Sequence, residues 1–345
     1  MTDKEYFNID ALNSSLLGEL LVSPKRYTYA KEHQNDPSDE TSASRLGTAI
    51  HCYLFKPEEF EKDYAITTSV KIEGMMGKFI EKLVVLEETC GLVAAGDLTE
   101  TDLKNQAWIS AGFKQSFDTV LKNFAKEENQ DYYNELKANV GKICLTEEEF
   151  NTILSCVESI RLHKAAYEAL ALDTDTENKT VISEECIEWT ENEIKCKIKP
   201  DRITVYSHTK ELVAVDLKTT SKTVYSSDNG VGFANMYISR GYHRQAAFYI
   251  RGLKNRYPDF SISFYCAAVE TTGGFETVLY KIPKAVLDLG DLEVAKALDL
   301  LKWYTNACSW DYPKDYYESD GVRELNPDLD DYSKKCNADK EVQVH

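Results

Sequence analysis

The chain has 345 residues, of which 43% are hydrophobic, and it carries a formal net charge of −18. This length predicts one elaborated α/β domain with enough apolar side chains for a substantial core. No stretch approaches the roughly 18 uncharged apolar residues that a membrane-spanning helix needs, and the N-terminus lacks the basic-then-apolar order of a signal peptide. We therefore expect a cytoplasmic protein that does not enter a membrane.

The first half of the chain reads as helical. Apolar residues at helical spacing predict helices over residues 8–22 and 45–55. His51 lies one turn after Gly47 in the second of these, so the missing side chain of the glycine is expected to leave space beside the imidazole. Residues 74–172 are rich in Glu, Lys, Leu and Ala with few helix breakers, and they predict a helical insertion.

The second half changes to the β-branched and aromatic residues that are typical of strands. We expect strands over residues 181–189, 193–206, 211–219, 261–270 and 276–282, and helices over residues 241–253 and 287–307. These elements predict a single domain over residues 1–310 with a mixed sheet flanked by helices. Residues 311–345 form an acidic, turn-rich tail, which we expect to be partly disordered.

The nine cysteines are scattered and never lie closer than ten residues apart. Structural zinc usually has ligands at short spacing, and disulfide frameworks are typical of small secreted chains. The sequence therefore favours reduced, mostly buried thiols.

Basic residues are concentrated in one part of the chain. Residues 195–256 hold seven lysines and five arginines against four acidic residues, a charge of +8, whereas the remainder carries −26. Such a distribution can confine a polyanion to one groove and repel it elsewhere. A chance local excess of basic residues is the alternative.

Two aspartates and a lysine in a predicted hairpin carry the chemistry. Asp216 and Lys218 are two residues apart on one strand, so their side chains leave the same face, while Leu217 points into a core. Asp201 lies fifteen residues earlier, where the turn at residues 207–210 brings its strand beside that of Asp216. Such carboxylates suit Mg²⁺, and a nearby cation can position an attacking water. The alternative is that Asp201 caps a turn while Asp216 and Lys218 form a surface ion pair.

These residues resemble the RecB-like branch of PD-(D/E)xK nucleases and, within it, the exodeoxyribonuclease VIII (RecE) group of phages and prophages. The resemblance covers about residues 8–280, although residues 74–172 match only in helical character. Its motifs are Pro200-Asp201, Asp216-Leu217-Lys218, His51 in the sequence GTAIH, Gln245 with Tyr249 as QxxxY, and Ser23–Tyr27 (SPKRY).

The resemblance implies a role for each matching residue. His51, Asp201, Asp216 and the Leu217 carbonyl would bind Mg²⁺ or Mn²⁺, and Lys218 would position the nucleophile or stabilise negative charge. Gln245 and Tyr249, on one helical face, would hold DNA or orient the lysine. The alternative for His51 is a buried histidine that is hydrogen-bonded in the core. The alternative for Gln245 and Tyr249 is a buried amphipathic helix on which they are two polar tips. One further candidate carboxylate is Glu185, and the candidate DNA contacts are Thr219, Thr220, Lys222 and Arg244.

The resemblance also implies an activity and partners. The expected reaction is digestion of linear double-stranded DNA from 5′ to 3′ in a bacterial host cell, by a ring-shaped homo-oligomer. The 3′ single strand would pass to an annealing protein of the RecT type in phage-type recombination. Two alternatives stay open: a RecB-like nuclease of other polarity or single-strand preference, and a catalytically inactive DNA-binding module with the same fold.

Overall fold

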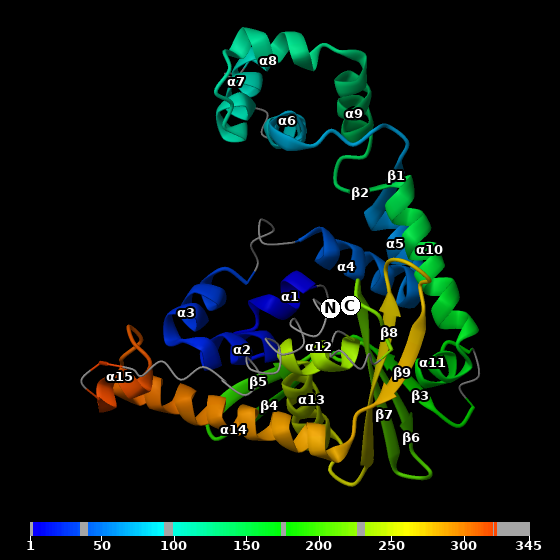
Figure 1. Ribbon diagram of the computed structural model, residues 1–345, viewed down its shortest axis with the longest axis vertical. Coiled ribbons are helices and arrows are strands. Elements are labelled where there is room, and N and C mark those ends of the chain that lie inside the picture. Colours follow the sequence, from blue (N-terminus) through cyan, green and yellow to red (C-terminus); the bar gives the residue numbers. More distant parts are fainter. Residues whose placement is uncertain are drawn as a thin grey trace, which may run out of the picture.

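A five-stranded mixed sheet forms the centre of the protein (Figure 1). The computed structural model describes residues 3–34, 41–92, 99–173, 177–225, 232–319 and 321–322. Strand β7 pairs in parallel with β8, and the other neighbouring pairs are antiparallel. In the order of the sheet, the strands are β3 (Thr180–Ser183), β6 (Arg202–Tyr206), β7 (Glu211–Thr220), β8 (Ser261–Glu270) and β9 (Thr277–Lys281). The predicted α/β fold with a mixed sheet is confirmed.

Helices cover both faces of this sheet. On one face α2 (Ser14–Val22), α13 (Tyr242–Arg256) and α14 (Lys284–Ala307) share a core with side chains such as Ala214 and Phe264. On the other face α4 (Ser42–Phe55), α10 (Glu147–Leu162) and α11 (Lys164–Ala169) pack near Val215 and Leu217. Alternate residues of β7 therefore enter different cores, as the period of two in a strand requires.

The helix predicted over residues 8–22 begins later in the structure, at Ser14, and a separate short helix precedes it. Helix α1 (Asp3–Asn8) ends before a short extended segment, in which the backbone of Leu12 bonds with Lys195 and Lys197. The side chain of Asn13 then accepts the Leu16 N–H and begins α2. Helix α3 (Pro24–Glu32) follows directly, with Pro24 at its first position. A polar N-cap inside the apolar pattern explains the break.

Two of the predicted strands are also interrupted. Strands β4 (Ile187–Glu191) and β5 (Ile194–Ile198) form a separate hairpin against α13 instead of continuing into the sheet. Pro200, which has no N–H to donate, lies between β5 and β6. Because of this break, Lys199 and Asp201 lie in irregular chain just before the first residue of β6, where their side chains can face a pocket.

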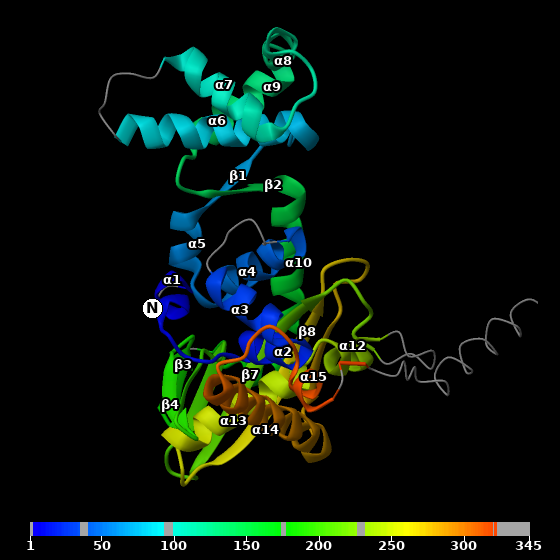
Figure 2. The ribbon, with the colours of Figure 1, turned by 90° about the vertical axis from the view of Figure 1, so that its left-hand side faces the viewer.

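A helical head projects from this body on a narrow neck (Figures 1 and 2). Its helices pack around a core of their own that includes Phe79, Leu83 and Val120. The neck is a parallel pair of short strands, β1 (Tyr64–Thr67) and β2 (Ile143–Thr146), with α5 (Pro57–Asp63) leading into it. The helices of the head are α6 (Gly74–Leu92), α7 (Glu100–Ala111), α8 (Phe117–Phe124) and α9 (Glu127–Ala138).

The remaining helices are α12 (Phe233–Ser239), before α13, and α15 (Lys314–Glu318), after α14. Most of the tail predicted for residues 311–345 lies outside the described residues. The eight cysteines within them are free thiols. None of the helices in that part of the chain is long and apolar enough to cross a membrane.

Candidate active site

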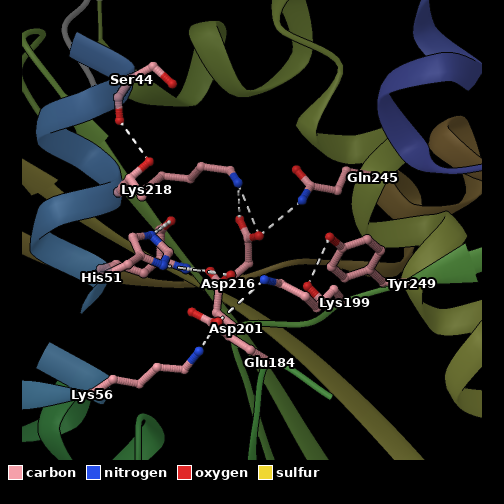
Figure 3. Close-up of polar contacts among 12 residues, drawn as sticks. Ser44, His51, Lys56, Glu184, Lys199, Asp201, Asp216, Lys218, Gln245 and Tyr249 are labelled. Atoms are coloured by element: carbon pink, nitrogen blue, oxygen red, sulfur yellow. Dashed lines mark hydrogen bonds and ion pairs between the residues drawn. The ribbon is translucent and has the colours of Figure 1, made fainter. Parts of the chain in front are cut away.

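Asp216 and Lys218 project from the same face of β7, towards α13 (Figure 3). The Lys218 Nζ lies 2.8 Å from Asp216 Oδ2 and 3.0 Å from Oδ1. Gln245 on α13 donates a hydrogen bond from Nε2 to Asp216 Oδ1 at 3.1 Å. Asp216 is only 3% exposed, so its carboxylate is held between an ammonium group and an amide away from water. This is a buried ion pair and not the surface pair of the simpler interpretation.

Asp201 binds the backbone of the same strand. It directly precedes β6, whose register pairs Arg202 with Val215, so Asp201 comes next to Asp216 across the two strands. Its Oδ2 accepts the Leu217 N–H at 2.7 Å. Its Oδ1 lies 3.7 Å from Nδ1 of His51. Both aspartates of the predicted hairpin therefore reach one site.

His51 reaches the site from α4, on the opposite face of the sheet. Its Nε2 lies 3.0 Å from the carbonyl oxygen of Leu217 and must donate, because a carbonyl can only accept. Gly47 makes room for the neighbouring strand: an added Cβ would lie 3.0 Å from the Thr219 hydroxyl. The expected space beside the imidazole is thus filled by Thr219, and the glycine lets α4 approach β7.

Burial and charge shift the ionisation of the central pair. Burial raises the pKa of Asp216 to about 6, against the opposing attraction of Lys218. Burial would lower the pKa of Lys218, but the negative charges of Asp216 and Asp201 outweigh it and raise that pKa. At neutral pH Lys218 is therefore an ammonium group that donates hydrogen bonds, and it is not a free base.

Tyr249 lies one turn after Gln245 on α13. Its hydroxyl donates to the carbonyl oxygen of Lys199 at 3.3 Å. Burial, together with the charges of Asp216 and Asp201, raises the tyrosine pKa, which keeps the hydroxyl protonated. Gln245 thus holds the Asp216 carboxylate, and Tyr249 holds the backbone of Lys199, two residues before Asp201.

Part of the site borders a pocket of 710 Å³ that lies beside α4. His51, Asp201, Leu217, Lys218 and Thr219 all line it. Sequence reasoning missed four other lining residues that matter to the chemistry. They are Tyr242, whose ring centroid lies 4.9 Å from Lys218 Nζ, and the charged group of Lys56, Glu184 and Lys199.

The predicted carboxylate at Glu185 is wrong by one residue. Glu185 is exposed, whereas Glu184 lines the pocket. Glu184 follows the end of β3 and has a φ of 48°, so the strand alternation that favoured position 185 no longer holds there. The sequence did not reveal that the strand ends before residue 184, and this is why the alternation pointed to the wrong residue.

The candidate DNA contacts separate into different environments. Thr219 lines the pocket, while Thr220 is buried and its hydroxyl accepts the Lys222 N–H. The Lys222 side chain is exposed beyond the end of β7. Arg244 donates to Glu293 at 2.6 Å and does not line the pocket. Of the four, Thr219 and Lys222 remain open to a ligand.

The charge of +8 over residues 195–256 does not produce a basic groove. Lys197 is fully buried and donates to the carbonyl oxygens of Tyr6 and Ile9 at 2.7 and 2.8 Å. The pocket itself is lined by four lysines and five carboxylates. Other basic residues of the segment are bound to protein groups: Lys199, Arg202, Lys218, Arg244 and Arg251.

The donor set suits a hard divalent cation. The two carboxylates and the Leu217 carbonyl offer oxygen, and His51 adds one nitrogen. Because His51 Nε2 donates to the Leu217 oxygen across 3.0 Å, this nitrogen would have to lose its proton and this hydrogen bond before it could bind a metal. In the described part of the chain, moreover, no three His, Cys, Asp or Glu side chains converge closely enough to hold a metal. Asp216 would have to turn from Lys218 to join the others.

Asp201 just before β6, and Asp216 with Lys218 two positions beyond it on β7, have the spacing of a PD-(D/E)xK motif. The sequence model of a family described as a PDDEXK-like domain of unknown function (DUF3799) matches residues 13–314. The chain belongs to this family. No curated protein matches it.

One solved structure that is similar is a "Putative exonuclease" from Eubacterium rectale, at 14% sequence identity. The match covers 81% of this chain and 96% of that one, with a TM-score of 0.36. At such a low score we draw nothing from the likeness.

Proposed function

We propose that the chain is a divalent-metal-dependent nuclease that hydrolyses phosphodiester bonds of DNA. The observation that carries the proposal is the buried pair of Asp216 and Lys218 beside the pocket, with Asp201 bound to the backbone between them. A buried ion pair rarely adds stability over well-packed apolar residues, so its position at a pocket favours a chemical role.

His51, Asp201, Asp216 and the Leu217 carbonyl would hold Mg²⁺ or Mn²⁺. Such an ion polarises a phosphoryl oxygen and activates water for attack. Lys218, which stays protonated, places positive charge where negative charge develops on the phosphoryl group. Gln245 fixes Asp216, and Tyr249 fixes the Lys199 backbone that leads to Asp201.

The finer proposal follows the resemblance to the exodeoxyribonuclease VIII group. The substrate would be linear double-stranded DNA, digested from 5′ to 3′ by a ring-shaped homo-oligomer. A RecT-type annealing protein would take the 3′ strand in recombination. In a pocket with more carboxylates than lysines, the divalent ion would also favour DNA binding, because it neutralises part of the negative wall.

Three substrates test the proposal in the presence of Mg²⁺: linear duplex, closed circular duplex and single-stranded DNA. We expect linear duplex to be degraded and the closed circle to stay intact. Faster digestion of single strands would favour a RecB-like nuclease of other preference. No hydrolysis of any substrate, with either Mg²⁺ or Mn²⁺, would favour an inactive DNA-binding module.

A further inference from the structure

Two lysines on a separate wall of the pocket share one carboxylate. Lys56 closes the C-terminal end of α4, and Lys199 lies between β5 and β6. Glu184 Oε2 is 2.8 Å from Lys56 Nζ and 3.3 Å from Lys199 Nζ (Figure 3). All three side chains are partly buried, with 26%, 16% and 15% of Lys56, Lys199 and Glu184 exposed, and all line the pocket.

The backbone joins this group to the proposed catalytic acid. The Glu184 N–H donates to the carbonyl oxygens of Pro200 and Asp201, at 3.1 and 3.3 Å. These bonds hold the Glu184 backbone beside Asp201, and Lys199 lies two residues before Asp201.

The geometry points to a second phosphate-binding subsite. We propose that Lys56 and Lys199 bind a backbone phosphate of the DNA strand next to the scissile one, and that Glu184 holds the lysines in place and competes with the DNA for them. This inference rests on the proposed nuclease function. Lys218 is already matched by the buried Asp216, so it cannot serve a second phosphate as well.

Charge supports this assignment. The two ammonium groups meet at one carboxylate oxygen of Glu184. Lys56 also lies 3.4 Å from Glu59, but Glu59 is 58% exposed and such a contact is weak. A phosphate that enters the pocket would find both ammonium groups already oriented.

The competing explanation is a structural staple, in which Lys56, Glu184 and Lys199 only link α4 to the sheet. Substitutions that keep the shape of a side chain but remove its charge distinguish this structural role from phosphate binding. In a staple, Glu184→Gln would weaken folding and leave DNA affinity unchanged or lower. In a phosphate subsite, the same change removes the competing charge, so DNA affinity should rise.

The test measures binding of a fluorescent duplex oligonucleotide by anisotropy, in EDTA and at several salt concentrations. We expect Glu184→Gln to tighten binding about three- to tenfold, and Lys56→Gln or Lys199→Gln to weaken it by a similar factor. Each lysine variant should also reduce the slope of log K against log salt by about 1. The controls are Lys179→Gln and Asp173→Asn, an ion pair of 2.6 Å that does not line the pocket, and both should bind as wild type.

Unchanged or weaker binding by a folded Glu184→Gln protein would overturn the subsite. If that variant has a markedly lower melting temperature, the Lys56→Gln/Lys199→Gln double variant decides, and wild-type binding by it would overturn the subsite. Because no hydrolysis is measured, failure of the subsite can be distinguished from failure of the proposed function. If the wild-type protein cleaves DNA but the variants show no change in DNA affinity, only the proposed subsite is wrong. If the variants change DNA affinity as expected but the wild-type protein cleaves no DNA, the protein is a DNA-binding module.

Discussion

The side-chain amide of Gln245 donates a hydrogen bond to the buried carboxylate of Asp216 across 3.1 Å. Helix α13 thereby fixes one oxygen of an acid whose other oxygen lies 2.8 Å from Lys218. In the proposed reaction Gln245 would act through Asp216, which makes it a positioning residue.

Gln245→Ala should lower kcat by about 10- to 100-fold, as loss of a residue that orients a metal ligand commonly does. DNA affinity should stay near wild type, because the amide is already occupied by Asp216. Steady-state cleavage together with anisotropy binding checks both. The matched control is Gln130→Ala, which breaks a hydrogen bond of 2.8 Å to Phe124 in the head and should not change kcat. A larger loss of affinity than of kcat would assign Gln245 to DNA instead.

Asp216→Asn should remove a loss of thermal stability that wild type shows as the pH rises through the pKa of Asp216. The folded state binds the Asp216 proton more tightly than the unfolded chain does, with a pKa of about 6 against 3.8. Ionisation therefore costs stability as pH rises from 3.8 to 6, and the full cost is present above 6. Asparagine lacks this pH-dependent cost but leaves Lys218 without its carboxylate, so the melting temperature of the variant relative to wild type should be higher at pH 8 than at pH 5.

Melting curves in EDTA at both pH values measure that difference. The exposed Asp131→Asn on α9 serves as the control, and its effect should be the same at both pH values. A melting-temperature difference, variant minus wild type, that is no higher at pH 8 than at pH 5 would show that Asp216 does not carry this burial cost.

Removing the Asp201 charge should weaken Mg²⁺ binding at least about tenfold, because a site of few charged ligands cannot readily lose one. Asp201→Asn retains an oxygen that can accept the Leu217 N–H, so folding should be preserved. His51→Ala should be milder, since water can replace one neutral ligand. Calorimetric titration with Mg²⁺ and Mn²⁺ measures these effects, with His33→Ala on the exposed surface as control. Unchanged metal affinity in Asp201→Asn would remove that residue from the site.

Charge reversal separates an exposed lysine from a paired arginine. Lys222→Glu should weaken DNA binding and lower its salt dependence, because this exposed side chain lies three residues beyond Thr219, which lines the pocket. Arg244→Glu should mainly destabilise the protein, since it places two carboxylates together at Glu293. Anisotropy and thermal melting, compared for the two variants, test the distinction. A greater loss of DNA affinity in a folded Arg244→Glu protein would reverse the assignment.

The sequence was sufficient to predict the hairpin that carries the candidate site, because this hairpin depends on local rules. The alternation along β7 places Asp216 and Lys218 on one face, and a four-residue turn returns Asp201 to the adjacent strand. A short segment of sequence therefore determines which face each side chain takes and how these two strands pair. Helical spacing likewise predicts that Gln245 and Tyr249 share a side of α13.

The free charge of the basic residues and the lining of the pocket could not be predicted from the sequence, because they depend on contacts between distant parts of the chain. Arg244 is neutralised by Glu293, 49 residues away, so a local count of charges overestimates the free positive charge. Lys197 is buried by α1, 191 residues earlier. Glu184 faces the pocket because the strand ends and the backbone turns, which periodicity does not reveal. Tertiary pairing therefore limits what composition can say about a binding surface.

The rate of linear-duplex cleavage by wild type, Lys218→Ala and Lys222→Ala, measured over a Mg²⁺ titration, tests the central claim most directly. Lys218 is the buried cation at Asp216, whereas Lys222 is an exposed lysine four residues later. We expect Mg²⁺-dependent cleavage by wild type, loss of all but a few per cent of the rate in Lys218→Ala with folding and DNA binding retained, and substantial activity in Lys222→Ala. Cleavage by Lys218→Ala at a rate close to wild type would contradict the proposed active site.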